Sequence, residues 1–228
     1  MKTRAFPYLL PFCVFFLFGC GPTASHSPTD AITFDTANRL DDFDFAASGD
    51  GGQSNWSIID NDAGRGLAQI DPEPNENRLA FALYHPLSAR DVNVSTRFMT
   101  ISGKIDQAAG LFVRFRSTDD YYCAVSANAL ENNVNLYRVV AGRRQMIGGV
   151  DVHVSGQTWH TLGVAARDDR LTVFFDGREL FVAIDRRVPG PPGKVGLWTR
   201  ADSMALFESL EIKSIDLMAR TIKSRKEN

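Results

Sequence analysis

Hydrophobic side chains recur at every second residue along most of this chain, in short runs that end at clusters of Gly, Pro, Asn and Asp. Successive side chains of a β-strand point to opposite faces, so each run predicts a strand that buries one face. More than ten such runs predict an all-β fold in which two antiparallel sheets pack as a sandwich. The predicted strands are residues 56–60, 66–71, 79–84, 92–101, 110–116, 121–126, 134–141, 144–150, 159–166, 171–176, 178–184, 194–199 and 206–212.

The segment 171–182 predicts the most clearly defined hairpin. Asp176-Gly177 separates two alternating runs, and this pair supplies the positive φ angles that a two-residue turn needs. Leu171, Val173 and Phe175 are therefore expected to face the core. Helical character is confined to a single turn within 128–133 and a short C-terminal helix from Ile215 to about Lys226.

Residues 1–19 predict a secretion signal. A short basic region precedes an apolar stretch, Ala5 to Gly19, that is too short to span a bilayer. The stretch ends in Leu17-Phe18-Gly19-Cys20, which resembles the lipobox of bacterial lipoproteins. The resemblance implies that the thiol of Cys20 receives diacylglycerol, that the chain is then cut before Cys20, and that the new amino group is usually acylated as well. These acyl chains would anchor the protein in a lipid bilayer. The alternative is an ordinary signal peptide with an incidental cysteine.

The same resemblance implies a place in the cell envelope. Gly21 follows Cys20, and in enteric lipoproteins a residue other than Asp at this position favours transfer to the outer membrane. Whether the domain faces the periplasm or the cell surface stays open. Residues 20–31 are small, polar and interrupted by proline, which predicts a flexible tether. The sandwich is then expected over 32–213, and a basic tail or helix over 214–228.

The charge and the cysteine content of the mature chain limit the partners and the crosslinks that we expect. Loss of Lys2 and Arg4 with the leader leaves 23 basic and 27 acidic side chains, a net charge of −4. Such a balance does not attract nucleic acid or anionic lipid. Of the three cysteines, only Cys123 remains after the leader and Cys20 are set aside, so we expect no intramolecular disulfide and a buried, inert thiol.

Four stretches resemble one group of bacterial concanavalin A-like, laminin G-like domains, related in appearance to the 3-keto-disaccharide hydrolase domain. They are residues 107–116, 127–138, 159–162 and 192–202, and the Asn-Ala-Leu-Glu-Asn-Asn-Val run that begins at Asn128 is the most specific. The resemblance spans about Ile32 to Ile212. It implies a jelly roll of two curved sheets, whose concave face accommodates sugar in many relatives. It implies neither one shared reaction nor a catalytic residue.

Polar and aromatic residues around the strand 110–116 are the first candidates for a sugar-binding surface. Sugar hydroxyls need hydrogen-bond donors and acceptors, and the C–H faces of sugars stack on aromatic rings. In regular alternation, Arg114 and Arg116 extend from one face of the strand together with Phe112. The alternative is structural: Arg114 pairs with Glu131, and the asparagines cap a tight turn. The candidates are Arg114, Arg116, Tyr122, Asn128, Glu131, Asn133, Tyr137 and Arg138.

A second group of candidates follows later in the chain. Trp198, Arg200 and Asp202 lie at the end of a late strand, although a tryptophan in an alternating strand is usually buried in the core. Trp159 and His160 point to opposite faces of their strand. We expect Trp159 in the core and His160 on the surface or on the polar face, where it joins the ligand-binding candidates.

Catalytic motifs are lacking, so the sequence favours a non-catalytic glycan-binding module. Sandwich hydrolases resembling family 16 carry Glu-x-Asp-x-Glu on one strand, and the chain has neither this run nor a Gly-x-Ser-x-Gly elbow. Two alternatives stay open: an enzyme that acts on a modified disaccharide through His160, Arg114 and Glu131, and an envelope interaction module without a small ligand. No cofactor is expected, apart from a structural calcium ion at Asp60-Asn61-Asp62 or Asp119-Asp120.

Overall fold

A computed structural model describes residues 29–34, 37–49, 52–62, 64–186 and 191–214 of the chain. The predicted leader, Cys20 and the predicted C-terminal helix lie outside these residues, and so does the side chain of Cys123. Among the described residues, no helix has the length and apolar character needed to cross a membrane.

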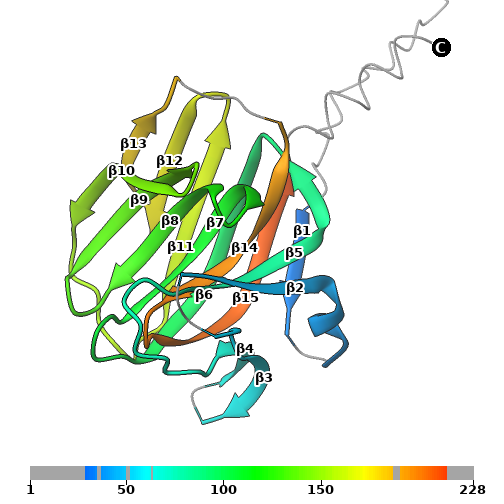
Figure 1. Cartoon of the computed structure of the whole chain (residues 1–228), viewed down its shortest axis with the longest axis vertical. Helices are drawn as coiled ribbons and strands as arrows, with labels where there is room; N and C mark the ends of the chain where they lie inside the picture. The colour runs from blue at the N-terminus through cyan, green and yellow to red at the C-terminus, as the bar shows by residue number, and fades with distance from the viewer. Residues whose placement is uncertain (1–28, 35–36, 50–51, 63, 187–190, 215–228) are drawn as a thin grey trace, which may run out of the picture.

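Two antiparallel sheets stack face to face (Figure 1). The seven-stranded front sheet has the order β10-β9-β8-β7-β14-β5-β2. The eight-stranded back sheet has the order β13-β12-β11-β6-β15-β4-β3, and β1 pairs with β15 beside this path. The front sheet contains β2 (Phe43–Ser48), β5 (Leu79–Ala89), β7 (Ala108–Ser117), β8 (Asp120–Asn128), β9 (Asn133–Val140), β10 (Arg143–Asp151) and β14 (Gly193–Arg200). The back sheet contains β1 (Thr29–Thr33), β3 (Trp56–Asn61), β4 (Gly64–Gln69), β6 (Val92–Ser102), β11 (His160–Arg167), β12 (Arg170–Phe175), β13 (Arg178–Ile184) and β15 (Met204–Ser214).

Every predicted strand is present, and the predicted all-β sandwich is confirmed. Two further strands, β1 and β2, and the 3-10 helix Ala37–Asp42 were not expected. β1 begins at Thr29, within the predicted tether, and its register places Ile32 opposite Leu210 of β15. The sandwich therefore begins three residues before the predicted boundary at Ile32.

Alternation places one face of each sheet in the space between them. Val92, Val94 and Phe98 of β6 are buried there, as are Leu171, Val173 and Phe175 of β12. The predicted turn is also confirmed, because Asp176 and Gly177 have φ angles of 47° and 74°. A Cβ atom built on Gly177 would have no heavy atom within 4 Å, so a side chain would fit there. Glycine is favoured at this position because it adopts the positive φ angle without strain.

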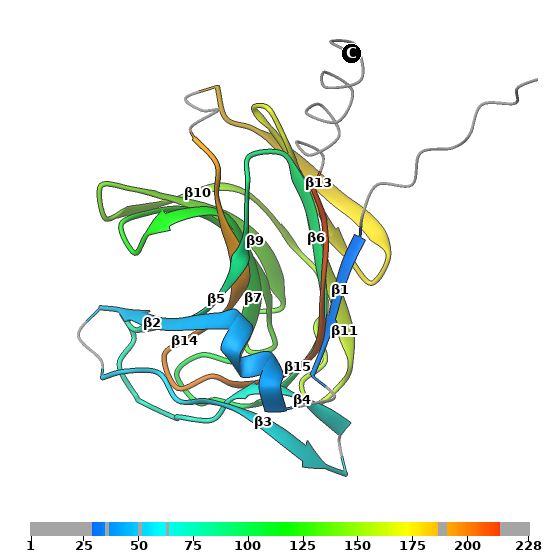
Figure 2. The same ribbon diagram turned by 90° about the vertical axis from the view of Figure 1, so that its right-hand side faces the viewer.

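The outer face of the front sheet is concave and holds a second apolar cluster. Figure 2 shows the front sheet curving away from the straighter back sheet. On its concave face, Phe81 lies at the centre of an aromatic group that includes Phe112, Phe115 and Tyr121, with ring centroids 5.4–5.7 Å from that of Phe81. Trp198 belongs to the same cluster and is only 1% exposed. The curved sheet thus fills much of its own concavity with aromatic side chains.

Candidate functional site

A cavity of about 280 Å³ remains on the concave face. The loop before β5 contributes Glu76 and Asn77 to its wall, β10 contributes Arg144, and the end of β14 contributes Arg200. Tyr121 of the aromatic cluster and Val139 also line it. This volume is close to the lower end of the range of roughly 300–1,000 Å³ that is usual for small-ligand sites.

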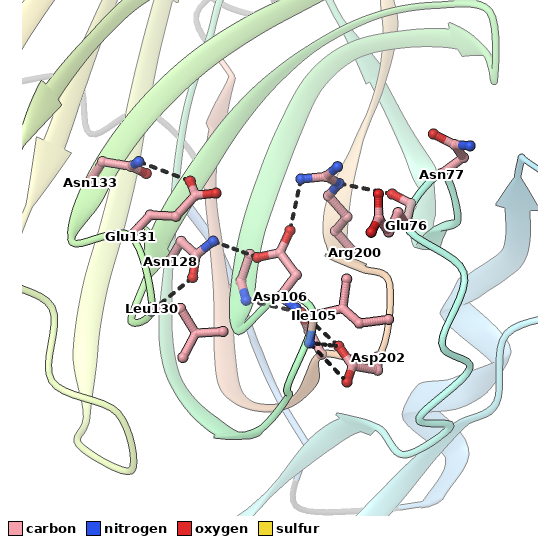
Figure 3. Close-up of polar contacts among 12 residues, drawn as sticks. Glu76, Asn77, Ile105, Asp106, Asn128, Leu130, Glu131, Asn133, Arg200 and Asp202 are labelled. Carbon is pink, nitrogen blue, oxygen red and sulfur yellow. Dashed lines mark hydrogen bonds and ion pairs between the residues drawn. The ribbon is translucent and has the colours of Figure 1, made fainter.

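Arg144 and Arg200 also line an adjoining polar recess. Figure 3 shows how the side chains from the end of β14 and from the turn between β8 and β9 meet there. The recess is lined by Asp106, Ala108, Asn128, Glu131, Asn133, Asn135, Tyr137, Arg144 and Arg200.

Asp106 is the buried hub of this recess. Its side chain accepts hydrogen bonds from Asn128 Nδ2 at 2.6 Å and from Arg200 Nη1 at 2.9 Å. Burial raises the pKa of Asp106 above 3.8; the Arg200 guanidinium opposes this shift, and the nearby charge of Glu131 adds to it. Arg200 also donates from Nε to the backbone oxygen of Glu76 at 3.1 Å, so its guanidinium joins both walls of the site.

The accessible part of the recess combines amide, carboxylate and aromatic groups. Asn133 donates to Glu131 Oε2 at 3.0 Å, and both residues are accessible to solvent. The Arg144 guanidinium lies over the Tyr137 ring, 3.8 Å from its centroid. This contact holds an exposed cation beside the cavity and leaves its N–H groups directed to solvent or to a ligand.

Asp202 organises the loop that carries Asp106. Its carboxylate accepts hydrogen bonds from the backbone N–H groups of Lys104, Ile105 and Asp106, at distances of 2.7–3.2 Å. Burial raises the pKa of Asp202, but these backbone hydrogen bonds outweigh burial and leave the pKa below 3.8. Asp202 is therefore a positioning residue for the site.

Replacement of Asp202 by asparagine is expected to lower the free energy of unfolding by about 1–3 kcal/mol near pH 7, because charge-assisted hydrogen bonds are lost. The pKa of Asp202 is lower in the folded chain than its ordinary value, so its contribution is present above that value and is lost as the pH falls through the folded pKa. Urea unfolding from pH 7 to about pH 2 should show the wild-type and Asp202→Asn stabilities converging at low pH. A difference that stays constant with pH would contradict this role.

Five of the predicted ligand-binding residues line the recess: Asn128, Glu131, Asn133, Tyr137 and Arg200. Asn128 is also a turn residue, because its Oδ1 accepts the Leu130 N–H at 2.9 Å and its carbonyl accepts the Asn132 N–H at 2.7 Å. Trp198 lies in the aromatic cluster on the concave face. The predicted single turn and the predicted capping role of Asn128 are both confirmed.

The prediction that Arg114 and Arg116 share a face is wrong. Arg114 has a φ of 55°, and the pairing of β7 with β8 shifts register between Val113 and Ser117. This irregularity brings Phe115 onto the concave face with Phe112, while Arg114 is 3% exposed and donates to the backbone oxygens of Arg90 and Asp168. Arg114 pairs with Asp91, at 3.3 Å, rather than with Glu131.

Arg116 and two further candidates also lie away from the recess. Arg116 pairs with Asp120 at 2.6 Å. Tyr122 and Arg138 are buried and both donate to the Asp185 carboxylate. Burial, followed by the Asp185 charge and hydrogen bond, raises the pKa of Tyr122 to about 12. This network is almost entirely buried, so it stabilises the fold rather than binding a ligand.

Trp159 and His160 both differ from the prediction. Trp159 was expected in the core but is only half-buried, and His160 was expected on the surface or the polar face but is buried. Trp159 is half-buried beside a small cluster formed by Ala68, Met99 and Leu206, with the Arg97 guanidinium 4.3 Å from its ring centroid. His160 is only 8% exposed and stacks on Phe175, with centroids 4.9 Å apart.

His160, Arg114 and Glu131 do not form one active site. Both ring nitrogens of His160 are engaged, with Asp176 Oδ2 at 2.8 Å and the Ser155 carbonyl at 3.1 Å. His160 begins β11, whereas Arg114 contacts Asp168 just beyond the end of the same strand. The two residues therefore lie at opposite ends of the sandwich.

Sequence reasoning missed Glu76, Asp106, Asn135 and Arg144. Glu76 belongs to a segment with prolines that reads as a solvated loop, and Asp106 lies in the turn before a strand. Arg144 and Asn135 were within predicted strands, and the strand alternation that puts Asn135 on the same face as Tyr137 was the available signal. The strand order that brings these segments together is not visible in the sequence.

Within the part of the chain that the structure describes, no group of three or more His, Cys, Asp or Glu residues is placed to hold a metal ion. Asp60 and Asp120, from the two predicted calcium loops, pair with Arg65 and Arg116.

A larger, open trough of about 660 Å³ crosses the outer face of the back sheet. Small residues such as Gly163 and Ala165 form its floor, and Phe174 is the one aromatic residue in its lining.

The fold is that of the concanavalin A-like lectins and glucanases. Carbohydrate-binding module CBM66 from Bacillus subtilis is similar, with a TM-score of 0.59 and 19% identity over 75% of this chain and 95% of that module. A Bacillus subtilis protein of unknown function with a galectin-like fold has a TM-score of 0.62 and 12% identity, over 81% of this chain and 94% of that one. A Bacillus licheniformis β-glucanase has a TM-score of 0.55 and 12% identity, over 82% and 98% of the two chains.

No protein-family model matches the sequence, and no curated protein is similar to it at the level of sequence. At sequence identities of 12–19%, the similar structures show only the fold. The chemistry of the site has to be argued from the residues of this chain.

Proposed function

We propose that this protein binds a glycan in the cavity on the concave face of the front sheet, without cleaving it. The observation that carries the proposal is the convergence of Arg144, stacked on Tyr137, with Arg200 and Glu76 around one cavity above an aromatic floor. Paired donors and acceptors suit vicinal hydroxyls, and Tyr121, which lines the cavity, offers an aromatic ring for the C–H face of a sugar. Similar architectures that include a carbohydrate-binding module support the proposal.

The cavity favours a chain end or a side branch over the middle of a long polymer. The aromatic cluster around Phe81 fills the concave face where an extended chain would otherwise lie. The turn residues Asp119 and Gly142 close the cavity on one side, and Gly49 and Asn77 close it on the other. The remaining volume of about 280 Å³ accepts one or two sugar units.

The proposal extends to the location of the protein. From the leader and Cys20, we propose a lipid-anchored protein of the cell envelope that presents this site to envelope or external glycans.

A glycan array with matched arginine variants tests the proposed site. Arg143 and Arg144 are adjacent, exposed residues of the edge strand β10, but only Arg144 lies over Tyr137 and lines the cavity. Arg144→Ala is expected to weaken binding of every bound glycan about 10- to 100-fold through lost charge-assisted hydrogen bonds, whereas Arg143→Ala should bind like the wild type. Equal effects of the two variants, or no retained glycan, would count against the proposal.

Glycoside hydrolysis is the second candidate function. Asp106 and Glu131 line the same recess, and the charge of Glu131 helps to raise the pKa of Asp106, as in a general acid. Against it, Asp106 is 3% exposed, and both of its carboxylate oxygens accept hydrogen bonds. Cleavage of an array-positive glycan by the wild type, lost in both Asp106→Asn and Glu131→Gln, would favour the enzyme.

A further inference from the structure

The described part of the chain begins and ends at one end of the sandwich. In the register of β1 with β15, Thr29 lies opposite Lys213, so the first described residue is beside the end of the last strand (Figure 2). The turns at Arg90-Asp91 and Asp168-Asp169 lie at this end as well, because Ser214 pairs with Val92, and Asp168 N–H donates to Asp91. We call this surface the terminal end.

The Arg200 side of the candidate glycan site lies at the opposite end. β15 begins at Met204, directly after the turn that holds Arg200 and Asp202, and reaches the terminal end at Ser214. A strand of this length spans roughly 33–37 Å at about 3.3 Å per residue. Arg200 and the recess around Asp106 are therefore separated from the terminal end by most of the length of β15.

The terminal end is basic although the chain as a whole is acidic. Its exposed cationic side chains are Arg90, Arg167, Arg170, Arg186 and Lys213. The acidic residues there are Asp30, Asp91, Asp168 and Asp169, and Asp91 is already paired with Arg114.

We propose that the terminal end docks on an anionic lipid surface and so directs the Arg200 side of the glycan site away from the membrane. This inference rests on the proposed acylation of Cys20 and is independent of glycan binding. The nine residues from Cys20 to Thr29 reach at most about 30 Å, so a lipid on Cys20 keeps the terminal end close to headgroups without orienting it. Basic residues near an anionic surface supply the second contact that a single anchor lacks.

The lysines of the wild-type protein provide a matched test. Lys213 at the terminal end and Lys104 beside the glycan-site end are both exposed. The full, lipidated chain is incorporated into phosphatidylcholine vesicles with or without phosphatidylglycerol and treated with a membrane-impermeant amine reagent. Mass spectrometry then gives the rate of modification of each lysine on the vesicles and in detergent.

We expect modification of Lys213 to slow at least about fivefold on the anionic vesicles relative to detergent, and the rate at Lys104 to stay unchanged. Arg167→Glu with Arg170→Glu should abolish this protection, whereas Lys104→Glu with Arg178→Glu, a matched change of charge at the other end, should preserve it. Equal rates at Lys213 on vesicles and in detergent, protection of both lysines, protection without anionic lipid, or failure of the protein to remain with the vesicles would each overturn the proposal.

Discussion

Replacement of Phe81 by alanine is expected to lower the free energy of unfolding by about 3–5 kcal/mol and to abolish glycan binding. Phe81 is fully buried at the centre of the aromatic cluster, in edge-on or tilted contact with Phe112, Phe115 and Tyr121. Its loss leaves a cavity beneath the binding site, and Tyr121, which lines the site, loses its support. Urea unfolding followed by fluorescence measures the change in stability.

Phe45→Ala is the matched control for this prediction. Phe45 is 40% exposed and stacks on Trp56, with centroids 6.2 Å apart, at the edge of the front sheet. We expect a loss of about 1 kcal/mol or less and no change in glycan binding. A Phe81→Ala protein as stable as Phe45→Ala would show that the concave cluster is not a second core.

Replacement of Asp185 by asparagine is expected to destabilise the protein by about 3–5 kcal/mol, although the two side chains have almost the same shape. Asp185 and Arg138 form an ion pair, and their side chains are only 6% and 7% exposed. Asparagine would leave a buried guanidinium whose remaining side-chain partner is Gln145, at 2.7 Å from Nη2. Chemical denaturation at neutral pH measures the difference.

Removal of both charges separates the cost of an unpaired cation from the value of the pair itself. Arg138→Met combined with Asp185→Leu should recover most of the stability lost in Asp185→Asn, because no charge stays buried without a partner. If the double variant is as unstable as the single one, the network contributes through its shape and its hydrogen bond to Tyr122 instead.

Much of the fold could be predicted from sequence because alternation is a local property. Residues such as Val92, Val94 and Phe98 show their buried face without knowledge of their neighbours. β1 was missed for the same reason, because Thr29–Thr33 has few apolar residues and gains its place by pairing with β15. The irregularity at Arg114 was also invisible, since it depends on a positive φ angle rather than on residue type.

The candidate site could be predicted only in part. The run from Asn128 to Tyr137 is contiguous, so its residues stay together in the fold. Arg200, Asp106 and Glu76 converge on it through strand pairings that join distant segments, such as Leu79 with Arg200 and Ala109 with Thr199. His160 and Arg138 are polar as well, but both are buried and bind other protein groups: His160 contacts Asp176, and Arg138 contacts Asp185.

A crystal structure of the protein with its best-retained array glycan is the most direct test of the central claim, that the concave cavity binds sugar. The account predicts sugar density between Arg144, Arg200 and Glu76, with a terminal unit resting against Tyr121. Density in the trough on the outer face of the back sheet, beside Gly163 and Phe174, with an empty concave cavity, would contradict it.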